Sequence, residues 1–378
     1  MINSFFFWIK TRDNLYSFFC LKKLLRFVLF NPIWKIKIFR GVVNYMRSWM
    51  IVNYHIINKD PLIIVDVLQH RSFRSLDDFL PHPQKAHYVC LNWWHLESEA
   101  DIKIIKQQYE NYKKQFPENE ILYLCNSMTQ YTLFRNSSLP SMLCNQNAFL
   151  DEHMHTIESD SHKEYDAIYL AVAVPCKRHY LAKEIDRLAL ITYYAHFSKQ
   201  NYIDDIKTAL PHATWIIRPN PLKGYIAREK IHLYLNKAKV GLCLSAAEGA
   251  MYASVEYLLC GLPIVTTRSI GGRDVFFDDE YVMVVNDTPA AVKAGVDAMI
   301  KKNIPGSYIR EKTIKKMKGH RKRFLSWLTG ISPQSRKYSN EHVWQNIFTN
   351  KMLMSRRIRY IQNDIQHAGN QGENLCIK

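Results

Sequence analysis

Two acidic residues, Glu248 and Glu256, lie eight positions apart in a stretch that is otherwise small and apolar. On a helix such a spacing separates two carboxylates by about 12 Å along the axis, so that they can hold hydroxyl groups at two ends of one elongated ligand. The first amides of a helix have no partner inside it and bind anions such as a diphosphate. A nucleotide sugar has hexose hydroxyls, a diphosphate and ribose hydroxyls in that order. Two ordinary helix glutamates are the alternative, and the surrounding sequence decides between them.

The elements that must position these carboxylates form a predicted βαβ unit. Residues 240–244 are a short apolar run, typical of a buried parallel strand, and residues 245–249 are a loop of small residues. Residues 250–259 suit a helix, since Gly261 and Pro263 stand just past its end as cap and breaker. A second strand is predicted over 264–267. The loop and the start of the helix therefore carry Glu248, with Glu256 further along the helix.

This stretch resembles the nucleotide-sugar-binding half of the retaining GT-B glycosyltransferases of the large family 4 group. That group has a strand, a Ser-x-x-Glu-Gly turn, a Glu-x7-Glu helix, a Cys-Gly-Leu-Pro ending, a Val-rich strand and a Gly-Gly turn. The corresponding residues here are Ser245, Glu248, Gly249, Glu256, Cys260, Gly261, Pro263, Val265, Gly271 and Gly272. The resemblance implies transfer of a hexosyl group from a nucleotide sugar to a lipid-linked or saccharide acceptor, with retention of configuration and without a metal ion or cofactor.

The resemblance also implies roles for individual residues. Glu248 is assigned to the donor hexose hydroxyls and to catalysis, Glu256 to the ribose, and Lys177 to the leaving diphosphate. A cation at Lys177 would neutralise charge as the glycosidic bond breaks. The remaining predicted donor-binding residues are Gly249, Ala250, Met251, Arg178 and Gly272.

One position departs from the family pattern. The arginine that precedes the family's lysine by five residues is Val172 in this chain. Either Arg178, Arg268 or Arg273 supplies the second cation, or the site is weakened. A catalytically inactive GT-B-like binding protein is therefore an alternative.

The acceptor side is expected in the first domain. His70 and His95 both follow predicted strands, and open α/β sheets bind ligands beyond the carboxyl ends of their strands. A structural or solvated histidine is the alternative at each position. The glycine-rich loop usual in the first domain of the family is not recognisable, so acceptor binding has less support than donor binding.

Alternating strand and helix patterns predict an α/β fold of the GT-B type, with two Rossmann-like domains, parallel sheets and an intervening cleft. Helices are expected over 180–194 and, packed back on the first domain, over 343–361. The predicted units are a basic amphipathic arm (1–50), an N-terminal Rossmann-like acceptor domain (51–160), a C-terminal Rossmann-like nucleotide-sugar-binding domain (161–330) and a basic, partly helical tail (331–378).

The net charge of +17 over 378 residues predicts a polyanionic partner. Residues 1–50 carry nine Lys and Arg against one acidic residue, and these charges interrupt every apolar run. That pattern fits an arm lying on an anionic membrane surface. The alternative is that its apolar residues pack on the protein itself. We expect a cytoplasmic protein at the inner face of a membrane, with eight reduced cysteines. A basic nucleic-acid-binding protein with a Rossmann-like core is the further alternative, which the basic run 312–323 supports only weakly because it lacks interleaved aromatic residues.

The cluster at residues 151–155 contains acidic and histidine side chains (Asp151, Glu152, His153 and His155). Its spacing matches no closed zinc site, and the cysteines lie elsewhere in the sequence. We therefore expect no metal ion there.

Overall fold

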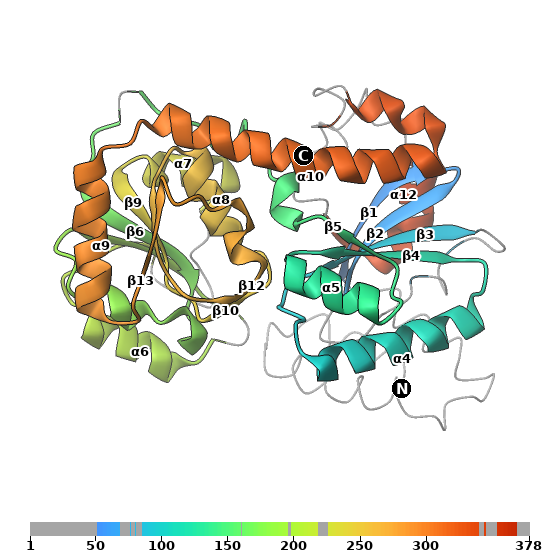
Figure 1. Cartoon of the computed structure of the whole chain (residues 1–378), viewed down its shortest axis with the longest axis horizontal. Helices are drawn as coiled ribbons and strands as arrows, with labels where there is room; N and C mark the ends of the chain where they lie inside the picture. Colours follow the sequence, from blue (N-terminus) through green and yellow to red (C-terminus); the bar gives the residue numbers. More distant parts are fainter. Residues whose placement is uncertain are drawn as a thin grey trace, which may run out of the picture.

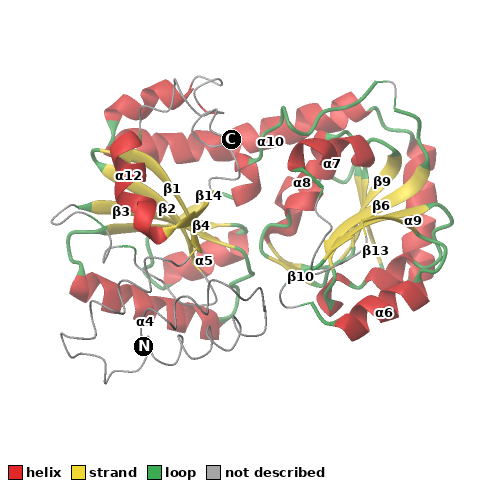
Figure 2. Ribbon diagram, turned by 180° about the vertical axis from the view of Figure 1, so that it is seen from behind, coloured by secondary structure: helices red, strands yellow, loops and turns green. Residues whose placement is uncertain are grey.

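The computed structural model describes residues 51–68, 76, 80, 85–159, 161–195, 198–217, 226–339, 344 and 354–368. The predicted arm 1–50 and the acceptor candidate His70 lie outside these residues. The described chain forms two α/β domains side by side, and one long helix, α10, runs along both of them (Figure 1). The reverse view shows a separate sheet at the centre of each domain (Figure 2).

The N-terminal domain is built on a six-stranded sheet in the order β14-β1-β2-β3-β4-β5. Its strands are β1 (Ile51–Lys59), β2 (Leu62–Leu68), β3 (Ala86–Asn92), β4 (Glu120–Cys125), β5 (Ser141–Leu143) and β14 (Met354–Arg357). Strands β2 to β5 are parallel, whereas β1 is antiparallel to both β2 and β14. The connecting helices α4 (Glu99–Gln115) and α5 (Met128–Asn136) begin after Ser98 and Ser127, whose side chains accept hydrogen bonds from first-turn amides.

The C-terminal domain is built on a fully parallel six-stranded sheet in the order β13-β11-β9-β6-β7-β8. Its strands are β6 (Tyr165–Val172), β7 (Leu188–Tyr193), β8 (Thr214–Ile217), β9 (Ala238–Cys243), β11 (Ile264–Thr267) and β13 (Val282–Val285). Its helices are α6 (Gln200–Ala209), α7 (Arg228–Leu235), α8 (Tyr252–Leu259) and α9 (Pro289–Lys302). The predicted α/β class with parallel sheets in two Rossmann-like domains is confirmed.

The helix predicted over 180–194 is wrong. The chain there forms a short 3₁₀ turn (His179–Ala182) and then strand β7, which pairs with β6 on one side and β8 on the other. Residues 188–191 are buried on both faces of the sheet. A central parallel strand is apolar on both faces, so its continuous apolar run cannot be told from a buried helix by spacing alone.

The tail differs from the prediction in form. Residues 345–353 lie outside the described part of the chain, and residues 354–357 form strand β14, which pairs Ile51 with Arg357 on the edge of β1. A short helix, α12 (Ile361–His367), then packs on β1 through Ile361 and Ile365. The tail was expected to pack back on the first domain. It does so through a strand of the sheet rather than through one continuous helix. Strand β1 itself was not predicted.

Helix α10 (Gly306–Ile331) belongs to the cores of both domains. Ile309 and Met317, in its first half, are buried in the C-terminal core. Phe324 and Leu328, in its second half, are buried in the core on one face of the N-terminal sheet. Since 26 residues of helix extend about 39 Å, this single element spans both domains and sets their separation.

A buried ion pair attaches α10 to the segment that joins the two domains. Arg321 on α10 donates to both carboxylate oxygens of Glu152, at 2.8 and 2.6 Å, and its guanidinium also donates to the carbonyl oxygens of Ala148 and Leu150. Burial raises the pKa of Glu152, but the hydrogen bonds and charge of Arg321 outweigh it and hold that pKa below its usual value. The carboxylate therefore stays ionised and paired.

A buried histidine, His320, precedes Arg321. Its Nδ1 accepts a hydrogen bond from the amide of Asn145, in the N-terminal domain, at 3.2 Å. Its ring centroid lies 5.2 Å from that of Phe276, in the C-terminal domain. Burial and, secondarily, the charge of Arg323 lower the pKa of His320 to about 4. The imidazole is therefore neutral at pH 7.

Replacing Glu152 by alanine is expected to destabilise the protein strongly, because it leaves the Arg321 guanidinium buried without its counter-ion. Breaking one partner of a buried pair costs about 3–5 kcal/mol. Urea denaturation followed by circular dichroism measures the loss in the free energy of unfolding. The control is Glu158→Ala, which removes a 41% exposed side chain paired with His232 and should cost under about 1 kcal/mol. Equal losses in the two variants would contradict the assignment.

Stability is also expected to fall as the pH is lowered from about 6.5 to about 4, because the unfolded chain protonates His320 in this window while the folded chain does not. The contribution is on the order of 3 kcal/mol, since each pKa unit is worth about 1.4 kcal/mol. Denaturation of the wild type and of His320→Asn at several pH values measures it. The difference between the two proteins should change across this window, and a constant difference would refute the prediction.

Candidate active site

The candidate site lies where the carboxyl ends of the two sheets meet. On the donor side, two short strands, β10 (Ala247–Glu248) and β12 (Ile270–Gly271), pair in parallel and place Glu248 opposite Gly271. On the acceptor side, residues following β3 and β4 contact this ladder. A Cβ atom on Gly249 would lie 2.7 Å from the Trp93 carbonyl oxygen, and one on Gly272 would lie 2.4 Å from the Asn126 carbonyl oxygen. Only glycine permits this approach of the two domains at these positions.

The structure brings together two of the residues assigned to chemistry. The Lys177 ammonium forms an ion pair with the Glu248 carboxylate, and the two side chains are 13% and 9% exposed. The turn that carries Lys177 is tied to the Glu248 loop by a hydrogen bond from the amide of Ala246 to the carbonyl oxygen of Cys176 at 3.0 Å. A cation and a carboxylate therefore lie side by side at the domain interface, although they are 71 residues apart in sequence.

A buried histidine packs beneath the turn that carries Lys177, on its side toward the core of the C-terminal domain. His179 is fully buried, and its Nδ1 lies 3.1 Å from the hydroxyl of Tyr202. Burial and the nearby charge of Lys177 lower the pKa of His179 to about 3, so its imidazole is neutral. The hydroxyl of Tyr169 donates to the Lys177 carbonyl oxygen at 2.6 Å and fixes the same turn. These contacts hold the backbone of Lys177 while its ammonium faces Glu248.

Two of the three arginines considered for the second cation are bound within the C-terminal domain. Arg273 is fully buried and donates to the carbonyl oxygens of Cys243, Ser245 and Thr267. Arg178, in the left-handed region at φ 50°, donates to the carbonyl oxygen of Leu244, to the hydroxyl of Thr267 and to the carboxylate of Asp287.

The third arginine, Arg268, is exposed just beyond β11, and within the described part of the chain no hydrogen bond or ion pair of its side chain is observed. Val172, at the position of the family arginine, is buried at the end of β6. Of these three arginines, Arg268 is therefore the one whose guanidinium has no observed partner among the described residues.

Helix α8 begins at Tyr252, two residues later than predicted. Met251 adopts a left-handed conformation at φ 49°, and the carbonyl oxygens of Ala250 and Met251 accept hydrogen bonds from the side-chain amide of Asn147 at 2.6 and 3.1 Å. The predicted anion-binding amides of Gly249, Ala250 and Met251 therefore lie in a loop. The first domain's connecting segment, rather than helix geometry, shapes that loop.

The two predicted carboxylates have different surroundings. Glu256 on α8 is 4% exposed, and its Oε1 lies 3.9 Å from Nε2 of His155, in the segment that joins the domains. Glu248 instead faces Lys177. The assignment of Glu256 to the ribose stays a prediction.

A loop of the N-terminal domain, residues 93–97, reaches the donor side. A Cβ atom on Gly271 would lie 3.0 Å from the Cβ of His95, so the predicted acceptor candidate is beside the β10–β12 ladder. The side chains of Trp93 and Trp94 are 47% and 50% exposed. The rings of Trp94 and His95 lie 4.8 Å apart. This loop therefore carries two exposed indole side chains and places His95 beside the β10–β12 ladder.

Sequence reasoning missed Glu97. Its carboxylate accepts hydrogen bonds from the amide of Gly271, at 3.2 Å, and from the hydroxyl of Ser127, so it joins the two domains. The sequence offered one indication of this role, namely that Glu97 follows shortly after the end of β3. The neighbouring polar residues share that position, so it does not identify Glu97.

Asparagines complete the contact between the domains. The side-chain amide of Asn145 donates to the carbonyl oxygens of Asn126 and Gly272, at 2.8 and 2.7 Å. Gly272 in turn donates its amide to the carbonyl oxygen of Gly249 at 2.7 Å. Predicted donor-site glycines are therefore held by the first domain.

Among the residues that the structure describes, no cluster of His, Cys, Asp and Glu could hold a metal ion. In the 151–155 cluster, Glu152 is paired with Arg321 and His155 faces Glu256. No helix in the described ranges has both the length and the apolar composition needed to cross a bilayer.

The sequence and the fold were compared with those of known proteins. Residues 222–318, which include Glu248, Glu256 and both interface glycines, match the family model described as Glycosyl transferases group 1. None of the curated proteins matches the chain in sequence.

Two solved structures are similar in fold. The crystal structure of TarM has a TM-score of 0.51 at 15% identity, over 73% of this chain and 55% of TarM. The structure of HepE from Anabaena in complex with UDP has a TM-score of 0.50 at 12% identity, over 65% of this chain and 72% of HepE. This chain thus spans little more than half the length of TarM. The chain has the GT-B fold of two Rossmann-like domains, and residues 222–318 of its sequence match the family model of the group 1 glycosyl transferases.

Proposed function

We propose that this protein is a glycosyltransferase that moves a hexosyl group from a nucleotide sugar to a saccharide or lipid-linked acceptor, with retention of configuration. The observation that carries the proposal is the Lys177–Glu248 pair beyond the carboxyl ends of β6 and β9, within a chain whose segment 222–318 matches the group 1 family model. Ligands of open α/β sheets bind beyond the carboxyl ends of the strands, which is where this pair lies.

Each residue has a role in this proposal. Lys177 stabilises the negative charge that develops on the diphosphate as the glycosidic bond breaks, since a preorganised cation acts most strongly where charge appears in the transition state. Glu248 accepts hydrogen bonds from donor hydroxyls, which requires its carboxylate to be shared between Lys177 and the sugar. Glu256 binds the ribose hydroxyls. The amides of residues 249–251, with Gly272, contact the phosphates or the sugar. Arg268 is the candidate for a second cation.

No metal ion or cofactor has a role in the proposal, because lysine, arginine and backbone amides carry the charge of the diphosphate. The HepE structure contains UDP, which supports UDP-sugars as the first donors to try. On the acceptor side we assign Trp93, Trp94 and His95, because the backbone of Trp93 and Trp94 and the Cβ of His95 lie against the donor loop, and both indoles are exposed.

Substitution of Glu248 by glutamine should nearly abolish transfer, with a loss of about 100-fold or more in kcat, while nucleotide binding is largely retained. Glu256→Ala should instead weaken nucleotide-sugar binding by about tenfold, equivalent to about 1.4 kcal/mol. Release of free nucleotide from a panel of UDP- and GDP-sugars measures turnover, and titration calorimetry measures binding. The control is Glu184→Ala, which changes an exposed residue of the same domain. Full activity in both site variants would remove the assignment.

The alternative is a GT-B-like binding protein without turnover. Val172, buried in place of the family arginine, is the observation that favours it. Nucleotide-sugar binding to the wild type, without nucleotide release in the presence of any tested acceptor, would support this alternative over the enzyme.

We further propose that the protein acts at the cytoplasmic face of a membrane and that residues 1–50 contact anionic lipid. The support is compositional: charge and large apolar residues alternate in this arm. The basic run 312–323 offers less support, because Lys316 is paired with Asp278 and Arg321 with Glu152.

The full chain should sediment with phosphatidylglycerol vesicles and not with phosphatidylcholine vesicles, and added salt should weaken the binding because it screens surface charge. Neutralising Lys22, Lys23 and Arg26 together by glutamine should reduce it. Stronger retention on duplex or single-stranded nucleic acid than on the anionic vesicles would favour the nucleic-acid-binding alternative.

A further inference from the structure

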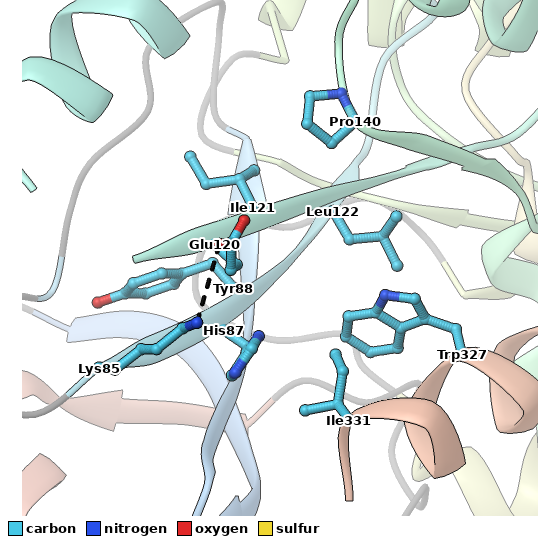
Figure 3. Close-up of a pocket in the computed structure, with 9 residues that line it drawn as sticks. All are labelled: Lys85, His87, Tyr88, Glu120, Ile121, Leu122, Pro140, Trp327 and Ile331. Carbon is cyan, nitrogen blue, oxygen red and sulfur yellow. Dashed lines mark ion pairs between the residues drawn. The ribbon is translucent and has the colours of Figure 1, made fainter. Parts of the chain in front are cut away.

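A pocket of about 330 Å³ lies at the edge of the N-terminal sheet opposite to the candidate active site (Figure 3). It is formed at the amino ends of β3 and β4, whereas Trp93 and Asn126 follow their carboxyl ends. A strand of seven residues is about 20 Å long, so a ligand in this pocket would not touch the reacting groups. The volume is at the lower end of the usual range for small-molecule sites, about 300–1,000 Å³. The lining residues that decide its chemistry are Lys85, His87, Glu120, Leu122, Trp327 and Ile331.

One wall of the pocket is apolar and combines residues that are far apart in the sequence. The indole of Trp327 and the side chain of Ile331 project from the last turns of α10 toward Leu122 on β4 (Figure 3). Both side chains from α10 are partly exposed. The pocket therefore forms only because α10 returns from the C-terminal domain. It presents one aromatic and one aliphatic surface, against which a ligand ring of suitable size can pack.

The opposite wall is polar and has no net charge. The Nζ of Lys85 lies 3.9 Å from Oε1 of Glu120, and each side chain is 52% exposed, so both can hydrogen-bond a ligand. His87, 8% exposed, lies beside Lys85 in the pocket wall (Figure 3). Its Nδ1 has no hydrogen-bond partner among the described residues. Burial and the charge of Lys85 lower the pKa of His87, against the weaker influence of Glu120, so the imidazole is neutral at pH 7.

We infer that this pocket binds one ring of an uncharged saccharide. The C–H face of a sugar ring packs against Trp327 and Ile331, while its hydroxyls hydrogen-bond to Lys85, Glu120 and His87. An anionic ligand would meet the carboxylate of Glu120 and a cationic ligand the ammonium of Lys85. A wholly apolar ligand would desolvate all three polar side chains without replacing their hydrogen bonds. A small, neutral, hydroxyl-rich ring with one apolar face satisfies both walls.

This inference stands on the pocket and does not require the proposed activity. If the protein is a glycosyltransferase, a sugar site some 20 Å from the reacting groups would hold a distant unit of a long saccharide acceptor or a separate saccharide molecule. A three-sugar fragment then binds at the pocket regardless of whether the donor site is intact.

The experiment uses the full chain and three neutral probes, maltotriose, cellotriose and N-acetylated chitotriose, with binding measured by saturation-transfer NMR and titration calorimetry. At least one probe should bind saturably, with a Kd of about 1 mM. Trp327→Ala and Glu120→Gln should each weaken that binding about tenfold or more. Glu248→Gln should leave it unchanged, which separates this site from the candidate active site.

Tyr360→Ala is the matched control, because Tyr360 is an exposed aromatic residue, 44% exposed, of the same domain that does not line the pocket. Glu120→Gln keeps the size of the side chain and guards against a Trp327→Ala protein that fails to fold. The inference is overturned if none of the probes binds the wild type, if binding survives both pocket substitutions, or if glucuronic acid or glucosamine oligomers bind at the pocket in preference to the neutral probes.

Discussion

The burial of α10 in two separate cores is the constraint on which the rest of the molecule depends. Ile309 and Met317 anchor one half of the helix in the C-terminal domain, and Phe324 and Leu328 anchor the other half in the N-terminal domain. A helix is stiff over this length, so the two sheets are held with their carboxyl ends toward each other. The Arg321–Glu152 pair fastens the connecting segment to the same helix. The candidate site at the domain interface and the pocket at the far edge of the sheet both follow from this placement.

The glycines of the donor side allow the backbones of the two domains to approach each other closely. Gly249 and Gly272 meet the backbone of the N-terminal domain at distances that leave no room for a Cβ atom, and Gly271 lies still closer to the Glu248 carbonyl oxygen in its own ladder. Glu97 and Asn145 then hydrogen-bond across the interface to Gly271 and Gly272. The N-terminal domain thus helps to shape the loop that the donor would use.

In the C-terminal domain, the buried guanidinium of Arg273 holds that loop in place. Arg273 donates hydrogen bonds to three carbonyl oxygens at or just beyond the ends of β9 and β11, those of Cys243, Ser245 and Thr267. Hydrogen bonds from a charged donor to backbone carbonyl groups stabilise an irregular loop without a helix cap. Lys177, in contrast, directs its ammonium at the Glu248 carboxylate rather than at backbone carbonyl groups.

The sequence by itself determined the strand–loop–helix–strand unit around the two glutamates and its resemblance to a family pattern. The small-residue loop, the two glutamates and the Gly-Pro ending identify this unit over residues 240–267, because turn chemistry and apolar runs act over short distances. Only the tertiary structure decided the rest. The strand at 188–193 replaces a predicted helix because it is buried on both faces between neighbours. Arg273 and Arg178 point inward, Glu97 joins the domains, and β14 completes a sheet begun some 300 residues earlier. Those outcomes depend on contacts between distant residues, which no local pattern encodes.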